Sequence, residues 1–204
     1  MSSMAHARIA SLELVTPAAA LPASLSELKA QLRLDGHDQD GKLDADLRAA
    51  VAYAESYTGR QLISAEWTDR LWSFTDPIVL RKAPVISVET ITYVDFEGAP
   101  QVLATTEWSL EKSREGPGQI HRAYGKFWPS ARTQWDAVTI EFTTGYGEAP
   151  GDVPFDLRRA VISVAEHFFE NPGAVALAER GSMFFEVPMA AKAVLDRYRM
   201  RYAA

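Results

Sequence analysis

The longest uninterrupted helical pattern in the sequence runs from Asp40 to Leu62, and it constrains the fold more than any other segment. Its apolar residues recur every three or four positions and form one stripe, composed of Leu43, Leu47, Val51, Ala54 and Tyr57. Asp40, Asp44 and Asp46 stand in the first turns, where the helix dipole favours carboxylates, and Gly59 can form a left-handed C-terminal cap. Burying each large apolar residue contributes roughly 1.5–3 kcal/mol, so this helix needs a packing partner from the chain or from another subunit.

Three further helices are indicated, two of them beyond a long region with strand-like patterning. They begin at local start signals: Ser24 with Glu27 three positions on, Pro154, and Pro188. The amphipathic helix after Pro154 is the natural packing partner of the Asp40–Leu62 segment. Residues 24–62 and 152–204 are therefore predicted to be helical, with a helical hairpin in the first part.

The intervening residues 64–147 follow a strand pattern. Six short runs are rich in aromatic and β-branched residues: Trp67–Trp72, Ile78–Leu80, Val85–Val94, Trp108–Leu110, Gly118–His121 and Val138–Thr143. In the last run, apolar residues alternate with polar ones, which predicts one buried and one solvated face. Between Val88 and Ile91 the alternation changes phase, which predicts a β-bulge.

The order of these patterns defines the expected architecture. Residues 1–23 are predicted to form an extended, proline-punctuated arm with a candidate short strand at Leu12–Val15. The fold class is α+β, because a helical bundle is interrupted by an inserted antiparallel β-sheet or small barrel. Residues 1–204 are expected to form a single domain with this β insertion.

Composition and charge exclude several classes of protein. The 204 residues carry 27 acidic and 21 basic side chains, a net charge of −6, and 47% are hydrophobic, which suffices for a packed core. A free-standing nucleic-acid-binding protein would usually have a basic excess. The absence of cysteine excludes disulfides and thiolate chemistry. Because no segment resembles a signal peptide or the roughly 18 apolar residues of a membrane span, we expect a soluble protein made in the cytoplasm.

Catalytic and metal-binding patterns are nearly absent. His167 and Glu170 could share a helical face as metal ligands, but no histidine follows one turn later, so a surface or helix-end role is favoured. The Gly-Tyr-Gly of residues 145–147 follows a strand, yet it lacks the third glycine and the lysine of phosphate-binding loops. Glu148 would also repel phosphate, so a turn is favoured. We therefore expect no catalytic residue, no metal and no cofactor.

Two segments near the C-terminus are candidate contact surfaces. The last helix carries more arginine and tyrosine than the helix dipole requires, at Arg197, Tyr198, Arg199, Arg201 and Tyr202. Both residue types are favoured at protein interfaces. Before this helix, Met183, Phe184 and Phe185 form a glycine-flanked apolar triplet, which is typical either of a subunit contact or of a core segment.

Several short sequence segments, in their order along the chain, carry a family resemblance. They are Pro22–Leu25 with Leu32–Asp35, Tyr53–Leu62, Pro84–Val88, Ala123–Pro129 and Ala137–Gly147. In this order they resemble the head-tail connector, or adaptor, proteins of long-tailed phages. Similar proteins occur in gene transfer agents, the phage-like particles that some bacteria make. The resemblance covers the chain from about Pro22 to Glu170, and the shared order is more specific than any single phrase.

The resemblance implies a structural role without enzymatic activity or cofactor. It implies a ring, with twelve copies as the expected number, that docks under the portal protein, extends the DNA channel and receives a stopper or tail-terminator protein. DNA would pass without sequence-specific binding, as the acidic balance allows, and no membrane would be involved. The expected location is the head-tail interface of a virion or phage-like particle assembled in the bacterial cytoplasm.

The same resemblance assigns roles to the candidate contact residues. It makes the small residues Ala50 and Ala54 subunit contacts, together with residues 183–185, and makes the segment from Arg197 to Tyr202 a portal contact. The alternative hypothesis is a small cytosolic enzyme or a nucleic-acid-binding module whose site the sequence does not reveal.

Overall fold

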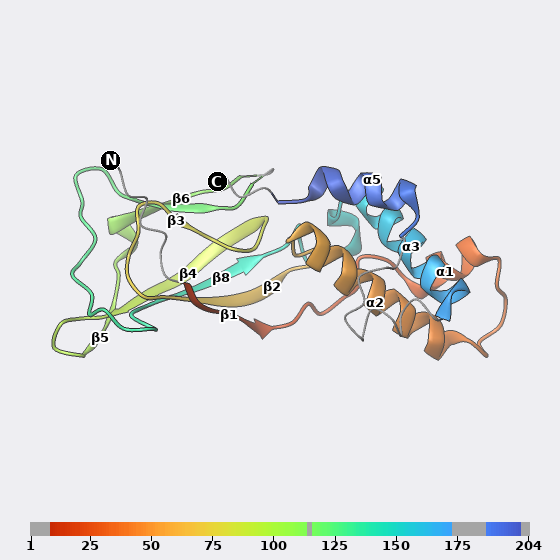
Figure 1. The fold of residues 1–204 in the computed structure, drawn as a ribbon, viewed down its shortest axis with the longest axis horizontal. Helices are drawn as coiled ribbons and strands as arrows, with labels where there is room; N and C mark the ends of the chain where they lie inside the picture. The colour runs from red at the N-terminus through yellow and green to blue at the C-terminus, as the bar shows by residue number, and fades with distance from the viewer. Residues whose placement is uncertain (1–8, 114–115, 173–186, 201–204) are drawn as a thin grey trace. The chain divides into compact units, whose positions relative to one another are not determined.

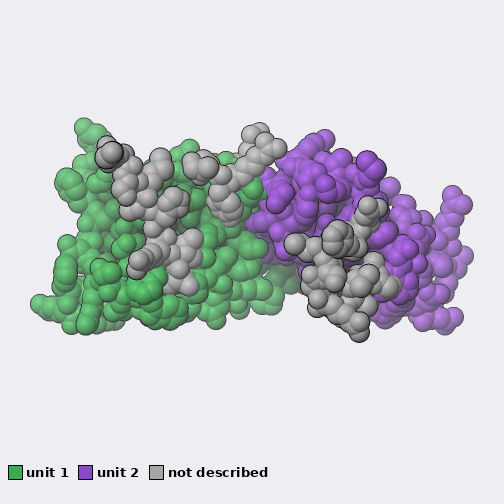
Figure 2. Space-filling model, in the orientation of Figure 1, with its two compact units in different colours: residues 1–18, 64–146, 200–204 green, residues 19–63, 147–199 purple. Residues whose placement is uncertain are grey.

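The computed structural model describes residues 9–113, 116–172 and 187–200. The chain divides into two compact units, coloured separately in Figure 2. They are a β unit of residues 1–18, 64–146 and 200–204 and a helical unit of residues 19–63 and 147–199. The predicted α+β class is confirmed.

The helical unit is built from helices that Figure 1 labels: α1 (Leu25–Leu32), α2 (Asp40–Thr58), the 3-10 helix η2 (Pro150–Asp152), α3 (Phe155–Glu170) and α5 (Met189–Tyr198). Helix α2 packs against α3, as predicted, and α5 also packs against α3. Helix α1 contacts both α2 and α3, so the finer prediction of an N-terminal hairpin is not confirmed. In the described part of the chain, no helix has both the length and the apolar character needed to cross a membrane.

Helix α2 has the predicted end and a slightly different buried face. The backbone of Gly59 is left-handed, with φ of 73°, and its N–H donates to the carbonyl oxygen of Glu55. The buried face comprises Leu43, Asp46, Leu47, Ala50, Ala54 and Thr58. Val51 and Tyr57, which the sequence pattern places on this face, are only partly buried. The predicted and observed faces differ because spacings of three and of four residues both fit the helical period. After Leu47, the predicted face continues to Val51, four residues on, and the observed face continues to Ala50, three residues on.

Helix α1 begins with the predicted capping box. The Glu27 N–H donates to Ser24 Oγ at 3.2 Å, and the Ser24 N–H donates to Glu27 Oε2 at 2.7 Å. Arg158 of α3 donates to Glu27 Oε1 at 2.5 Å and to the carbonyl oxygen of Pro22 at 2.9 Å, so the cap also ties α1 to α3. The backbone hydrogen bond from Ser24 is the largest cause that lowers the pKa of Glu27.

The Glu27→Gln substitution should therefore reduce stability in a pH-dependent way. A lowered carboxyl pKa stabilises the fold above the unfolded-state pKa, and this contribution is lost as pH falls through the folded-state pKa. We expect a drop in melting temperature on the order of 1–2 °C at pH 7, which shrinks towards zero near pH 3. Thermal unfolding at both pH values measures it. The exposed Glu148→Gln variant carries the same charge change, and an equal pH-dependent drop there would contradict the role of the cap.

The β unit contains two antiparallel sheets, with strand orders β1-β2-β8-β4-β5 and β3-β7-β6 (Figure 1). The strands and one 3-10 helix are β1 (Ile9–Thr16), β2 (Ala65–Leu71), β3 (Ile78–Val79), β4 (Val85–Val94), β5 (Pro100–Val102), η1 (Thr105–Glu107), β6 (Trp108–Glu111), β7 (Gln119–Arg122) and β8 (Val138–Thr144). The described strands do not close into a barrel, so the small barrel is not confirmed. The antiparallel sheet, the other form of the prediction, is observed.

Strand β8 lies at the centre of the five-stranded sheet, between β2 and β4. Val138, Ile140 and Phe142 are buried, which confirms the predicted alternation. They share one apolar core with residues of β3 and β7, so the two sheets face each other. The pairing of β4 with β8 shifts register between Val88 and Thr90, which confirms the predicted bulge.

Candidate functional site

The C-terminal end of α5 is docked on the beginning of α3 through one carboxylate. Tyr198 Oη donates to Asp156 Oδ1 at 2.8 Å, and Arg197 Nη2 donates to Asp156 Oδ2. Asp156 lies in the first turn of α3, where the helix dipole also favours a negative charge. The ring of Tyr198 and the guanidinium of Arg197 therefore fix the end of α5 within the helical unit.

A second set of contacts joins the same end of α5 to α2. Tyr57 Oη donates to Asp196 Oδ1, which lowers the pKa of Asp196 and raises that of Tyr57. Arg60 Nε donates to the carbonyl oxygen of Tyr198 at 2.5 Å. The guanidinium of Arg199 lies 5.3 Å from the centre of the Tyr57 ring, within cation–π range. Residues 196–199, here called the α5 terminus, thus form an ordered cluster of charged and aromatic groups.

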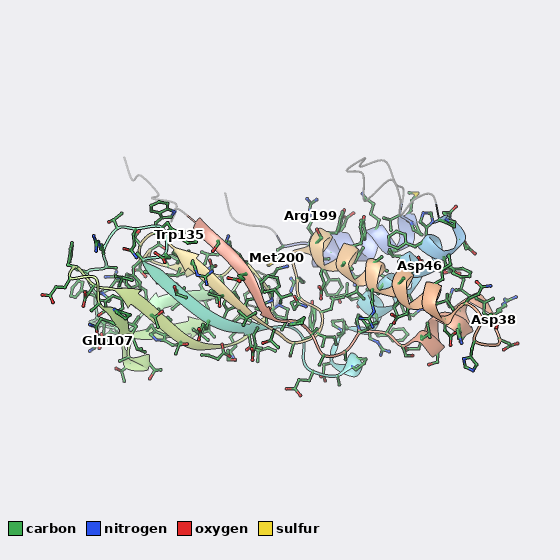
Figure 3. The ribbon with its side chains drawn as sticks, turned by 90° about the horizontal axis from the view of Figure 1, so that it is seen from below. Asp38, Asp46, Glu107, Trp135, Arg199 and Met200 are labelled. Carbon is green, nitrogen blue, oxygen red and sulfur yellow. The ribbon has the colours of Figure 1, made fainter. Side chains whose placement is uncertain are left out.

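The α5 terminus contains three of the five predicted portal-contact residues. Arg197 keeps 67% of its side chain exposed despite its ion pair with Asp156. Arg199 is exposed immediately after the helix, as Figure 3 shows. Arg201 and Tyr202 lie outside the described residues. The structure brings Arg197, Tyr198 and Arg199 together on one end of a packed helix, with the side chains of Arg197 and Arg199 exposed.

The two alanines predicted as subunit contacts lie elsewhere than the hypothesis requires. Ala50 and Ala54 are both 0% exposed, on the buried face of α2 inside the helical unit. Their small side chains serve the packing of helices within one chain, because no surface of theirs is left for a second subunit. The other predicted contacts, Met183, Phe184 and Phe185, lie outside the described residues.

The segments considered for metal or phosphate binding have local structural roles. The Asn171 side-chain amide donates to the carbonyl oxygen of His167 at 3.0 Å, at the end of α3. Among the described residues, no group of three His, Asp or Glu side chains could hold a metal ion. Asp152 lies against Gly147, where an added Cβ would meet the Asp152 carboxylate at 2.2 Å. A carboxylate in that position disfavours phosphate, and residues 145–147 belong to the segment that connects β8 to η2.

The β unit contains a buried ion pair that the sequence patterns did not predict. Asp69 of β2 is completely buried, and Arg81 Nε donates to its Oδ2 at 3.1 Å. Arg81 Nη2 also donates to the carbonyl oxygen of Ser11 in β1. Burial raises the pKa of Asp69, because desolvation outweighs the attraction of Arg81. Trp67, Asp69 and Leu71 are two residues apart and so lie on the same, apolar face of the strand. This alternation was the sequence pattern that could have indicated that Asp69 is buried.

An exposed aromatic loop follows β7 in the same unit. Tyr124 is fully exposed and Phe127 is 80% exposed, while the next residue, Trp128, stacks on Phe74 with ring centres 5.0 Å apart. A shallow groove of about 370 Å³ includes both exposed rings and the ion-paired side chain of Arg122. The loop therefore has a packed base and an aromatic surface of the kind found at protein contacts.

Comparison with known proteins finds one family whose model matches part of the chain. Residues 22–101 match the model of the phage gp6-like head-tail connector protein family. No curated protein matches the chain significantly.

Solved structures extend this likeness over almost the whole chain. A chain from the neck of an empty gene transfer agent particle, computed with C6 symmetry, is 25% identical with a TM-score of 0.75. A chain from the virion of a native gene transfer agent particle is 28% identical with a TM-score of 0.75, and one from a native neck with C12 symmetry is 28% identical with a TM-score of 0.74. Each match covers 95% of this chain and 97% of the other. The family match over residues 22–101 and the likeness of the whole fold make the chain similar to head-tail connector proteins.

Proposed function

We propose that the chain assembles as a homo-oligomeric ring at the head-tail junction of a phage or gene transfer agent particle. The ring docks under the portal protein, extends the DNA channel and joins the head to a stopper or tail-terminator protein. The observation that carries this proposal is the likeness, over 95% of the chain, to a chain from a particle neck with C12 symmetry. In this role the protein is structural and not an enzyme.

The charge balance supports a channel that DNA can traverse. With a net charge of −6, the chain lacks the basic excess that would hold phosphates by counterion release. A chain with net negative charge repels DNA phosphates overall, which keeps the duplex from adhering. Under this proposal the isolated protein has no appreciable affinity for DNA at physiological salt.

The α5 terminus is the proposed portal contact, together with Arg201 and Tyr202. The contacts of Asp156 and Tyr57 hold this end of α5 in place, so binding would cost little ordering of Arg197 and Tyr198. Residues 183–185 remain the proposed subunit contacts within the ring. Ala50 and Ala54 are not included, because they are buried within one chain.

The mass of the complex with the portal protein tests the proposal. Native mass spectrometry of the purified protein should give a monomer or small oligomer. Adding the portal protein encoded nearby should produce a ring-sized complex with about twelve copies, in keeping with C12 symmetry in a similar structure. A protein that stays monomeric with its portal would contradict the connector function.

The Arg199→Glu variant refines the same experiment by testing the portal contact. We expect portal affinity to fall roughly tenfold or more, because an exposed cation is replaced by an anion without loss of a buried contact. Arg48→Glu, an equal charge change on the exposed side of α2, is the control. If both variants bind the portal protein with equal affinity, the α5 terminus is not the portal contact. The proposed ring would be unaffected by that result.

A further inference from the structure

The free edge of β1 is an unusual feature of the five-stranded sheet. β1 is eight residues long, and among the described residues it has a strand partner, β2, on one side only. Its outward edge presents backbone N–H and C=O groups that a further strand could pair. Leu14 and Val15 are 44% and 58% exposed, and the strand contains neither lysine nor proline. Such an edge is a template for pairing with another chain.

The opposite edge of the same sheet ends differently. β5 is only three residues long and begins with Pro100, which cannot donate to a ladder. It covers β4 only at Thr92–Val94. Within the described chain, residues 86–90 of β4 have β8 as their strand partner on one side, and no strand on the other. Among the residues that the structure describes, the sheet therefore has one unpaired edge at β1 and one unpaired stretch at β4.

β1 is held in place as a preformed edge. Arg81 binds the carbonyl oxygen of Ser11, Arg70 Nη1 donates to Glu13 Oε2 at 2.7 Å, and Thr16 Oγ1 donates to Glu66. The only charge on the strand, Glu13, is neutralised by Arg70. Pairing along β1 would consequently require little ordering of the strand and no desolvation of an unpaired charge.

Strand direction makes the two edges compatible. Each neighbouring pair in the order β1-β2-β8-β4 is antiparallel, so β1 and β4 run in opposite directions. In a ring, the copies of the chain are related by rotation about the ring axis. When the sheets of neighbouring copies lie side by side, the corresponding strands therefore keep the same direction. The β1 of one copy would then run antiparallel to the β4 of the next, which continues the hydrogen-bonding pattern of the sheet.

Residue register makes them compatible as well. Through β2 and β8, Glu13 lies in the same row as Thr90, and Thr16 lies in the same row as Ser87. Both strands contain two residues between these rows, since Val15 is extra in the β1 bulge and Glu89 is extra in the β4 bulge. The row between them joins Leu14 to Val88 through Trp67 and Phe142. Pairing residues 13–16 with residues 87–90 of the next copy without a bulge sets Val15 opposite Val88.

We propose that the edge of β1, at Glu13–Thr16, pairs with residues 87–90 of β4 in an adjacent copy of the chain, so that the sheet continues from copy to copy. This inference rests on the proposed ring. It assigns the subunit contact to backbone pairing in the β unit, with Val15 and Val88 as an apolar cross-strand pair. The interface is heterologous, as a closed ring of more than two copies requires.

Cysteine cross-linking tests the register directly, because the chain has no cysteine of its own. The full-length Val15→Cys/Val88→Cys variant is assembled with the portal protein and mildly oxidised. Directly opposed Cβ atoms in an antiparallel pair lie about 4.5–5.5 Å apart, close enough for a disulfide after a small movement. We expect a ladder of disulfide-linked multimers that collapses on reduction. Each single-cysteine variant should give at most a linked dimer.

The matched control is Val15→Cys/Val102→Cys, whose second cysteine lies at an exposed position of β5. It should give no ladder. If the Val15/Val88 variant forms rings by native mass spectrometry but no ladder, the edge pairing is overturned and the ring stands. If the wild-type chain forms no ring with portal, the proposed function and this inference fail together. A ladder from both double variants would also overturn the assigned register.

Discussion

Replacing Asp69 by alanine is expected to lower the free energy of unfolding of the β unit by about 3–5 kcal/mol. Asp69 is completely buried, and its carboxylate is the ion-pair partner of Arg81, whose side chain is only 21% exposed. Removing the carboxylate leaves the largely buried guanidinium without its ion-pair partner, while its hydrogen bond to the carbonyl oxygen of Ser11 remains. The uncompensated charge, and not the lost attraction, supplies most of the expected loss.

Tryptophan fluorescence during chemical denaturation measures this effect selectively. All five tryptophans of the chain lie between residues 67 and 135, within the β unit. Asp76→Ala is the matched control, because it removes a partly exposed ion pair with Arg122 and should cost at most about 1 kcal/mol. Similar losses of unfolding free energy in the two variants would show that disrupting the buried Asp69 ion pair costs no more than disrupting the partly exposed Asp76 ion pair.

The double variant Asp69→Leu/Arg81→Met should recover much of the loss. Burial raises the pKa of Asp69 despite the attraction of Arg81, so we expect the charged pair itself to add little net stability. Replacing both partners by apolar side chains removes the stranded charge and fills the space. If the double variant is as unstable as Asp69→Ala, the loss of unfolding free energy would instead come from losing the hydrogen bond between Arg81 and Ser11.

The sequence pattern was sufficient for elements whose signals are local. The capping box at Ser24, the left-handed cap at Gly59 and the alternation of Val138, Ile140 and Phe142 each depend on residues within a few positions of one another. Such signals report backbone preference and the period of burial, which a single segment determines. All six predicted strands are present for the same reason.

Long-range partners could not be predicted in this way. β1 pairs with β2 across the intervening segment that contains α1 and α2, so the short strand pattern at Leu12–Val15 gave no indication of its partner. Asp69 and Arg81 meet only because β2 and the segment after β3 are brought together. Small residues on a helix fit a tight contact within the chain as well as one between subunits, so the sequence alone did not separate these two roles for Ala50 and Ala54.

Replacing Ala50 by glutamate distinguishes these two roles of α2. In the structure, Ala50 is fully buried among the helices, so the new carboxylate must either lose its charge or disrupt the packing of α2. Buried glutamates can have pKa values raised by about 3–4 units, which corresponds to about 4–5 kcal/mol, and the added volume costs more. We expect loss of the cooperative helical signal in far-UV circular dichroism, with or without portal present.

Ala52→Glu provides the matched control, because Ala52 lies on the exposed side of the same helix. It should change the helical signal and the melting temperature little. A subunit contact at Ala50 would give the opposite result, namely a folded Ala50→Glu monomer that fails to enter the ring. Loss of folding in Ala50→Glu, with ring formation intact in Ala52→Glu, would place the alanine-rich face inside the chain and leave ring contacts to surfaces such as the β1 edge.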